Sequence, residues 1–448
     1  MSKYYDYILK SGEIVTRKNG KWQKSLTDLG LKDGKITCLG DLKAEKANRT
    51  FDCNGLTILP GLIDSQVHFR EPGLEYKEDL ESGSRGAVLG GITAIFDMPN
   101  TKPSITNLES WHNKIDRAKN RMWCNYAFYV GATLNNIEEL PILEKQPTCC
   151  GVKIFMGSST GDLLVDQLSG LKKILSSIKR NVAVHSENEQ RLKERATVRV
   201  KDLAYSHTLW RDEEVAFSST QDLIKLALET GKKIHVLHVT TEQEMQLLSK
   251  NKHIATVEVT PQHLTFSAPE IYDRIGTYAQ MNPPIRSEQH RQALWKALNQ
   301  GVVDVLGSDH APHTREEKDK GYPLSPSGMP GVQTIVPIML DHVNKGHLSL
   351  FRLVELLAER PSKLFKLKNK GSIQIGNDAD FTIVDLKRKW RIENSWMATK
   401  CGWTPFDGYK VVGYPTATMI GGQFIQIESQ LNGQPKGNSL EFTDIDYL

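Results

Sequence analysis

Four polar side chains alternate along the stretch "DSQVHFREPG", and they include groups that could bind a metal ion or a carboxylate. They are Asp64, Gln66, His68 and Arg70. Every second residue of a strand points to the same face, so an extended stretch would place these side chains together. An imidazole can bind a metal ion, an aspartate can orient such a ligand, and a guanidinium can hold a carboxylate in two hydrogen bonds. One face of this stretch is therefore a candidate functional site.

Two further histidines end apolar runs of the strand type. His185 closes the run in "NVAVHSENEQ", and His238 closes the run in "KKIHVLHVTTEQE". Each is followed by a capping-box motif, S-x-x-E or T-x-x-E, which predicts that a helix begins soon after the strand. Both histidines are therefore expected where a strand ends and a loop begins. His235 lies in the middle of the second run, and we expect it to be a packed core or outer-wall residue.

Lys153 lies inside the apolar run "GVKIFMG", where a buried ammonium group is costly without a partner. Two interpretations fit this position. The lysine could form a structural salt bridge, or CO2 could carboxylate its amine to an anionic carbamate that bridges two metal ions. Burial would favour the second by depressing the pKa of the amine.

The run "VVDVLGSDHAPH" ends in a third cluster, formed by Asp309, His310 and His313. An aspartate at a strand end can bind a metal ion and exchange a proton with water. Because Asp and His are common in loops, this cluster alone would be weak support for a site. Its weight comes from the recurrence of such residues at five predicted strand ends.

The elements that must position these residues follow a regular alternation. Between Leu59 and about Leu367, strand-like runs alternate with longer helix-like segments such as "STQDLIKLALETG". This alternation predicts βα units and a parallel sheet, most economically a (β/α)8 barrel of the TIM type, whose active site lies where strands end. Short strands with turns near both ends predict a small β-sandwich domain from residues 1–57 and 368–448. Residues 58–367 would then form the catalytic barrel.

Composition and charge exclude several classes of protein. The 448 residues carry a net charge of +4 without a basic block, so we expect no nucleic-acid partner. No run approaches 18 uninterrupted apolar residues, which argues against a membrane span. The six cysteines show no CxxC spacing, and the first residues lack the apolar core of a signal peptide. We therefore expect a cytoplasmic protein that acts on a small molecule.

Motifs along nearly the whole chain resemble those of the amidohydrolase superfamily, and within it those of the dihydroorotases. The resemblance rests on "LPGLIDSQVHFREPGLEYKEDLESGSRGAVLGGIT", "DMPNTKP", "GVKIFMG", "VAVHSE", "HVLHVTT", "VTPQHL", "MNPPIR", "GSDHAPHTREEK" and "ADFTIVDL". It implies a hydrolase of de novo pyrimidine (UMP) biosynthesis. The implied reaction is the reversible cyclisation of N-carbamoyl-L-aspartate to (S)-dihydroorotate, with metal-bound hydroxide as the nucleophile and Asp309 as general acid and base.

The resemblance also implies one or two Zn2+ ions per chain. Its ligands correspond to His185 and His238 for the more buried ion, a carboxylated Lys153 as the bridge, and His68 and Asp309 for the more exposed ion. Gln66 departs from the pattern, because the family has a second histidine there and an amide oxygen is a poorer zinc ligand. Three alternatives follow: a binuclear enzyme with a weakened site, a mononuclear enzyme, and an inactive structural partner of aspartate transcarbamoylase.

The substrate-binding residues of the family match Arg70, Asn100, Asn282 and His313. The guanidinium fork of Arg70 suits the carboxylate of dihydroorotate. An allantoinase or a hydantoinase, the alternative cyclic amidohydrolases, would be expected to lack part of this set. The resemblance further leads us to expect a homo-oligomer, a dimer or tetramer, that could associate with aspartate transcarbamoylase.

Overall fold

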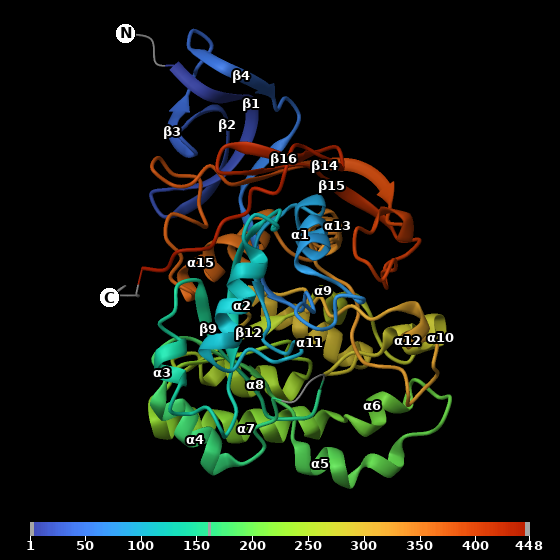
Figure 1. Cartoon of the computed structure of the whole chain (residues 1–448). Helices are drawn as coiled ribbons and strands as arrows, with labels where there is room; N and C mark the ends of the chain where they lie inside the picture. The colour runs from blue at the N-terminus through green and yellow to red at the C-terminus, as the bar shows by residue number, and fades with distance from the viewer. Residues whose placement is uncertain (1–3, 160–162, 444–448) are drawn as a thin grey trace.

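The computed structural model describes residues 4–159 and 163–443, which form an eight-stranded parallel barrel and a nine-stranded sheet. Figure 1 shows strands from both ends of the chain in the upper part of the molecule and the barrel with its helices below them. The predicted fold class, a TIM-type barrel joined to a small β unit from both chain ends, is confirmed. The β unit is one continuous hydrogen-bonded sheet.

The barrel strands follow one another in chain order, each parallel to its neighbour. They are β6 (Leu62–Val67), β7 (Ile92–Asp97), β8 (Asn125–Gly131), β9 (Cys149–Phe155), β10 (Val182–His185), β11 (Ile234–Val236), β12 (Ala255–Val259) and β13 (Val305–Leu306). Nearly all their residues are buried, because helices cover the outside and side chains fill the inside, and this explains the continuous apolar runs. The ring closes where the His68 amide donates to the His310 carbonyl at 2.7 Å.

Helices cover the outside of the barrel and fill the connections between its strands (Figure 1). The α-helices of the described residues are α1 (Leu80–Leu89), α2 (Leu108–Ala118), α3 (Leu140–Leu143), α4 (Leu168–Ser177), α5 (Glu189–Glu194), α6 (Ser206–Trp210), α7 (Glu213–Thr230), α8 (Glu242–Lys250), α9 (Pro261–Thr265), α10 (Glu270–Ile275), α11 (Glu288–Asn299), α12 (Arg315–Lys318), α13 (Ile335–Asn344), α14 (Leu350–Val354) and α15 (Arg360–Leu364). Shorter or wider turns are η1 (Ala196–Val198), η2 (Gly276–Ala279), η4 (Asn394–Trp396) and the π-helix η3 (Glu355–Glu359).

The two capping boxes predicted after His185 and His238 have different outcomes. α8 begins with the predicted box, in which the side chains of Thr241 and Glu244 each accept from the other residue's backbone N–H. The predicted box of Ser186 with Glu189 is wrong. Asn188 is the N-cap of α5, because its side chain is the one that accepts from a backbone N–H of the first turn.

The nine-stranded sheet joins the two ends of the chain. Its order is β17-β16-β15-β14-β5-β1-β2-β3, and β4 pairs with β1. The strands are β1 (Tyr4–Lys18), β2 (Lys21–Lys32), β3 (Lys35–Gly40), β4 (Lys46–Asp52), β5 (Thr57–Pro60), β14 (Phe381–Arg391), β15 (Lys410–Ile420), β16 (Gln423–Ile427) and β17 (Gln430–Leu431). The join itself is the antiparallel pair of β5 and β14, in which Leu59 lies opposite Thr382.

Segments after β14 also pack against the barrel. The Leu440 amide donates to the Tyr126 carbonyl at 2.9 Å, which places the chain near residue 440 beside the start of β8. Trp403 and Phe406 lie in a hydrophobic cluster with Met281 and other residues of the barrel loops. The domain boundaries given above, residues 1–57 with 368–448 and residues 58–367, stay a prediction.

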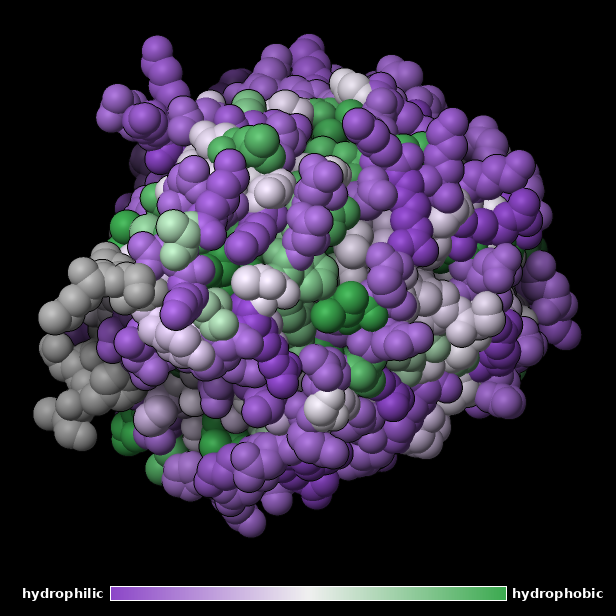
Figure 2. Space-filling model, turned by 90° about the horizontal axis from the view of Figure 1, so that it is seen from above, coloured by the Kyte–Doolittle hydropathy of each residue, from purple (hydrophilic) through white to green (hydrophobic). Residues whose placement is uncertain are grey.

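The face seen from above in Figure 2 is mostly hydrophilic, and its hydrophobic side chains form small separate patches. Single exposed apolar side chains, such as Leu26 of β2 at 76% exposure, are common on protein surfaces and require no partner. Within the part of the chain that the structure describes, no helix is both long and apolar enough to cross a membrane.

Candidate active site

A narrow cavity lies at the C-terminal ends of the barrel strands. Its lining residues are Gln66, His68, Arg70, Asn100, Lys153, Phe155, Ser159, His185, His238, Asn282, Asp309, Ala311, Ser327 and Gly328. The cavity therefore brings together every residue predicted to bind metal or substrate except His313. This is the end of the barrel where the sequence predicts the site.

The ends of the strands place these side chains. His185 is the last residue of β10, and Lys153 lies near the end of β9. Arg70, His238 and Asp309 follow β6, β11 and β13 with φ angles of 65°, 36° and 45°. Non-glycine residues are strained in this left-handed region, and such strain concentrates at functional sites. Three strained residues around one cavity support its identification as the active site.

His185 and His238 face each other, with 3.1 Å between His185 Nδ1 and His238 Nε2. His185 Nε2 lies 2.8 Å from a carboxylate oxygen of Glu187, which only accepts, so the ring proton is on Nε2. The lone pair of His185 Nδ1 therefore points at His238. Burial lowers the pKa of both imidazoles below the ordinary value, so both are neutral at pH 7.

His68 and Asp309 form a second close pair, with 3.1 Å between His68 Nε2 and Asp309 Oδ1. His68 Nδ1 donates to the Asn100 side-chain oxygen at 2.7 Å, which leaves a lone pair on Nε2 directed at the carboxylate. Gln66 Nε2 donates to the same Asp309 oxygen at 3.0 Å. Gln66 thus offers this oxygen a hydrogen, while its own side-chain oxygen is buried without a hydrogen-bond partner among the described residues.

Lys153 is fully buried, and among the described residues its Nζ has no hydrogen-bond partner. Its predicted alternative, a structural salt bridge, is not formed within residues 4–159 and 163–443. Burial lowers the pKa of this amine to about 7, although the charges of Asp309 and Glu258 act in the opposite direction. At that pKa the amine is partly neutral at pH 7, which is the form that reacts with CO2.

These features fit a bound cation. The His68–Asp309 pair directs two acceptors at one another, and two lone pairs repel unless a positive charge lies between them. The His185 Nδ1 lone pair is a further potential metal ligand in the same cavity. Among the described residues, no group of three or more His, Cys, Asp or Glu side chains is arranged to hold a metal ion. Lys153 lines the same cavity as these histidines and would supply a further ligand atom in its uncharged form. Imidazole nitrogen and carboxylate oxygen are donors that suit zinc.

Arg70 is a buried cation, 2% exposed, that forms no ion pair within the described residues. Its Nε donates to the Pro312 carbonyl at 3.2 Å, and its Nη2 lies 3.4 Å from His313 Nε2. Burial lowers the pKa of Arg70 to about 10, so the side chain is still charged at neutral pH. A buried guanidinium without a protein carboxylate fits an anionic group that a ligand supplies.

His313 contacts Arg70 but does not line the cavity. Lys77 Nζ donates to His313 Nδ1 at 3.1 Å, and His313 Nε2 donates to the Ser327 carbonyl at 3.0 Å. The two contacts agree on one tautomer, because an ammonium group only donates and a carbonyl only accepts. His313 therefore borders the carboxylate-binding position of Arg70, and its own contact with substrate stays a prediction.

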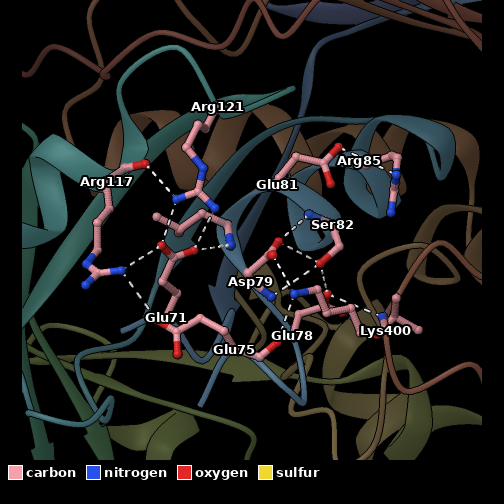
Figure 3. Close-up of polar contacts among 12 residues, drawn as sticks. Glu71, Glu75, Glu78, Asp79, Glu81, Ser82, Arg85, Arg117, Arg121 and Lys400 are labelled. Atoms are coloured by element: carbon pink, nitrogen blue, oxygen red, sulfur yellow. Dashed lines mark hydrogen bonds and ion pairs between the residues drawn. The ribbon is translucent and has the colours of Figure 1, made fainter. Parts of the chain in front are cut away.

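Ion pairs anchor the loop between β6 and α1 that carries Arg70. Figure 3 shows the Glu71 carboxylate between the guanidinium groups of Arg117 and Arg121, at 3.2 and 2.7 Å. Where the loop meets α1, Lys400 pairs with Asp79 at 2.6 Å. Since both ends of the loop are held by other segments, the backbone beside Arg70 is fixed before substrate binds.

His235 is a packed residue, as predicted. It is 1% exposed, its Nδ1 lies 2.9 Å from Thr256 Oγ1, and its ring lies 6.0 Å from the ring of Phe365. It belongs to the interior of the barrel below the cavity rather than to the cavity lining.

Sequence reasoning missed the residues that support the predicted ligands. Glu187, in the motif "VAVHSE", contacts His185, and Lys77, in "EYKED", contacts His313. Their positions inside these motifs could have identified them as site residues. His207 of α6 contacts Asn282 at 3.0 Å and had no such signal. It lies in a long connection between β10 and β11, and only the fold brings it beside Asn282.

Comparison with known proteins identifies the class. The chain matches the model of the amidohydrolase family over residues 57–425, and it belongs to this family. Similar curated proteins carry the name dihydroorotase. One from Methanosarcina acetivorans is 34% identical over 98% of this chain and 93% of its own length, and one from Pyrococcus furiosus is 34% identical over 92% of each. The resemblance seen in the sequence is thereby confirmed.

Solved structures agree on the fold. L-hydantoinase (dihydropyrimidinase) from Arthrobacter aurescens has a TM-score of 0.90 and 31% identity, covering 96% of this chain and 98% of its own. A D-hydantoinase has a TM-score of 0.87 and 28% identity, covering 96% and 97%. Cyclic amide hydrolases are thus similar to this chain over almost its full length.

Proposed function

We infer that this chain is a dihydroorotase, which interconverts N-carbamoyl-L-aspartate and (S)-dihydroorotate in pyrimidine biosynthesis. Its family and the names of its curated relatives support a cyclic amide hydrolase. The observation that carries the choice of substrate is Arg70, a buried guanidinium that lines the cavity and forms no ion pair among the described residues. Dihydroorotate carries a carboxylate next to its cyclic amide, whereas hydantoin and dihydrouracil rings lack that group.

The carboxylate end of the substrate is the part that Arg70 would bind. Two parallel N–H bonds from one guanidinium match the two oxygens of a carboxylate, which fixes the orientation of the ring as well as its position. Asn100 and Asn282 line the same cavity and would bind further oxygens, and His313, whose Nε2 lies 3.4 Å from Arg70 Nη2, borders the carboxylate-binding position.

The part of the cavity that is lined by the histidines, Lys153 and Asp309 would hold zinc. His185 and His238 with Lys153 as a carbamate would hold one ion, and His68 with Asp309 would hold another. When bound, zinc would activate a water molecule and polarise the ring carbonyl. Asp309 accepts the proton of the attacking water and returns it to the ring nitrogen as the amide bond breaks. In the biosynthetic direction the same carboxylate performs these transfers in reverse.

Gln66 bears on the number of metal ions. Its N–H group is directed at Asp309 Oδ1, so the side of His68 and Asp309 has one imidazole and one carboxylate that also accepts a hydrogen bond. The side of His185 and His238 has two neutral imidazoles supported by Glu187. We therefore propose that zinc binds more tightly on the histidine-pair side than on the Gln66 side.

Metal content per chain, measured together with dihydroorotate hydrolysis, tests this proposal. The protein is purified without chelator and measured as purified and after addition of zinc and bicarbonate. Activity with close to one metal ion would show that the histidine-pair side suffices, and activity with close to two would show that Gln66 tolerates a binuclear centre. No metal and no turnover would refute the enzyme and leave an inactive partner of aspartate transcarbamoylase. Hydantoin, dihydrouracil and allantoin serve as comparison substrates, and faster hydrolysis of any of them would overturn the choice of substrate.

We further propose that the protein is cytoplasmic, that it forms a dimer or tetramer, and that it can associate with aspartate transcarbamoylase. These proposals follow from the resemblance to dihydroorotases. The mass of the purified protein in solution, alone and mixed with aspartate transcarbamoylase, tests assembly and association directly.

A further inference from the structure

We propose that His207 is a positioning residue for substrate specificity: it turns the side-chain amide of Asn282 so that the NH2 group faces the substrate. The NH2 group of Asn282 then donates a hydrogen bond to an oxygen of the substrate, either of the carboxylate or of a ring carbonyl. This inference rests on the proposed function, which places the substrate in the cavity that Asn282 lines.

The proton of His207 is located by its neighbours. His207 is 2% exposed, and its Nε2 lies 3.2 Å from the Met281 carbonyl and 3.0 Å from Asn282 Oδ1. A carbonyl oxygen only accepts, so Nε2 carries the hydrogen, which faces these two oxygens and, at 3.4 Å, Ser327 Oγ. Burial lowers the pKa of His207 to about 3, so the ring is neutral at pH 7 and has this one N–H.

The located proton determines which end of the Asn282 amide faces the cavity. If the amide were turned over, its NH2 group would meet the His207 N–H, and two donors would oppose each other. Asn282 Oδ1 is therefore held by His207, and Nδ2 lies on the other side, 3.4 Å from Ser159 Oγ. Ser159 also lines the cavity. An NH2 group can bind an oxygen of the substrate but cannot bind a ring N–H.

His207 is held in this orientation at a cost. Its ring packs edge to face against Trp210 at 5.7 Å and Tyr322 at 5.9 Å. Its Nδ1 is buried and has no hydrogen-bond partner within the described residues. A buried acceptor without a partner destabilises a fold, so a histidine that served packing alone would be poorly suited to this position. The hydrogen bond from Nε2 to Asn282 Oδ1 is therefore the role that we assign to His207.

Two substitutions at residue 207 test the inference. His207→Leu removes the N–H and should raise KM for dihydroorotate about tenfold, the size of one lost hydrogen bond, with kcat within about twofold. His207→Gln keeps an N–H that can reach Asn282, and it should restore KM to within about threefold of the wild type. Melting temperature and metal content of both variants serve as controls for folding and for the metal centre.

A double-mutant cycle shows whether His207 acts through Asn282. Asn282→Ala should raise KM by itself, and adding His207→Leu should then change KM no further. An equal effect of His207→Leu in both backgrounds, or a wild-type KM in the single variant, would overturn the inference. Dihydrouracil as a second substrate separates the two oxygens: an effect confined to dihydroorotate identifies the carboxylate, and an effect on both identifies a ring carbonyl. Failure of the wild type to hydrolyse dihydroorotate would instead refute the proposed function.

Discussion

Replacing Arg70 by methionine should make the substrate-free protein more stable and the enzyme much less active. Arg70 is 2% exposed and forms no ion pair among the described residues. Burial lowers its pKa from 12.5 to about 10. At about 1.4 kcal/mol for each unit of pKa, the unbalanced charge costs the folded state about 3 kcal/mol. The bond from the charged guanidinium to the Pro312 carbonyl contributes about 1.5–3 kcal/mol, so after its loss Arg70→Met should gain at most about 1.5 kcal/mol in the free energy of unfolding.

The same substitution removes both N–H bonds to the substrate carboxylate. A hydrogen bond to a charged group contributes about 1.5–3 kcal/mol, so two such bonds correspond to a fall in kcat/KM of about 10² to 10⁴. Arg70→Lys is the matched control, because it keeps the charge and loses the fork. Its kcat/KM should lie between those of the wild type and Arg70→Met.

Urea unfolding of the metal-loaded proteins, with and without dihydroorotate, measures both effects. Substrate should stabilise the wild type and leave Arg70→Met nearly unchanged, since only a protein that binds the ligand is stabilised by it. Equal stabilisation of the two proteins by dihydroorotate would refute the carboxylate role of Arg70. A less stable Arg70→Met protein would refute the argument that the guanidinium is unbalanced without substrate.

Three further predictions concern the metal side of the cavity and the loop anchor. Asp309→Asn should keep its metal and lose about 10² to 10⁴ in kcat, because it can no longer accept a proton; kcat close to wild type would contradict this role. Gln66→His should retain a second equivalent of zinc that wild-type protein loses on dialysis against chelator, as metal analysis would show. Burial raises the pKa of Glu71, but hydrogen bonds from Arg121, the Leu80 amide and Arg117 outweigh it and hold the pKa below the ordinary value. The stability that Glu71 contributes is therefore present above the ordinary carboxyl pKa and lost as pH falls through the lowered value. In urea unfolding at decreasing pH, Glu71→Gln should start less stable at pH 7 and approach the wild type in acid.

The sequence predicted the barrel and most of the cavity lining because both depend on local patterns. An apolar run that ends in a histidine or aspartate fixes a strand and the end at which its polar residue lies, and the barrel then gathers these ends. His185, His238 and Asp309 were placed in this way. Lys153 was singled out because an ammonium group inside an apolar strand conflicts with its surroundings.

The contacts that orient the site residues could not be predicted from the sequence in the same way. The tautomer of His313 depends on Lys77, which approaches from another part of the chain, and the amide of Asn282 depends on His207 of α6. Such contacts are set by tertiary packing and leave no periodic signal. The predicted capping box at Ser186 failed for a related reason, since a one-turn motif cannot show which of two neighbouring polar residues will reach the backbone N–H groups.

The pairing of β5 with β14 has a consequence for the synthesis of the protein. Leu59 and Thr382 lie opposite each other, although more than 300 residues separate them. Translation proceeds at about 5–20 residues per second, so roughly 15–65 s pass between the synthesis of β5 and that of its partner strand β14. All four residues of β5 are buried in the finished fold, so during this time an apolar strand edge is open to other chains. Slower translation or higher temperature should therefore favour aggregation of this protein, and chaperones that cover exposed strands should improve its yield.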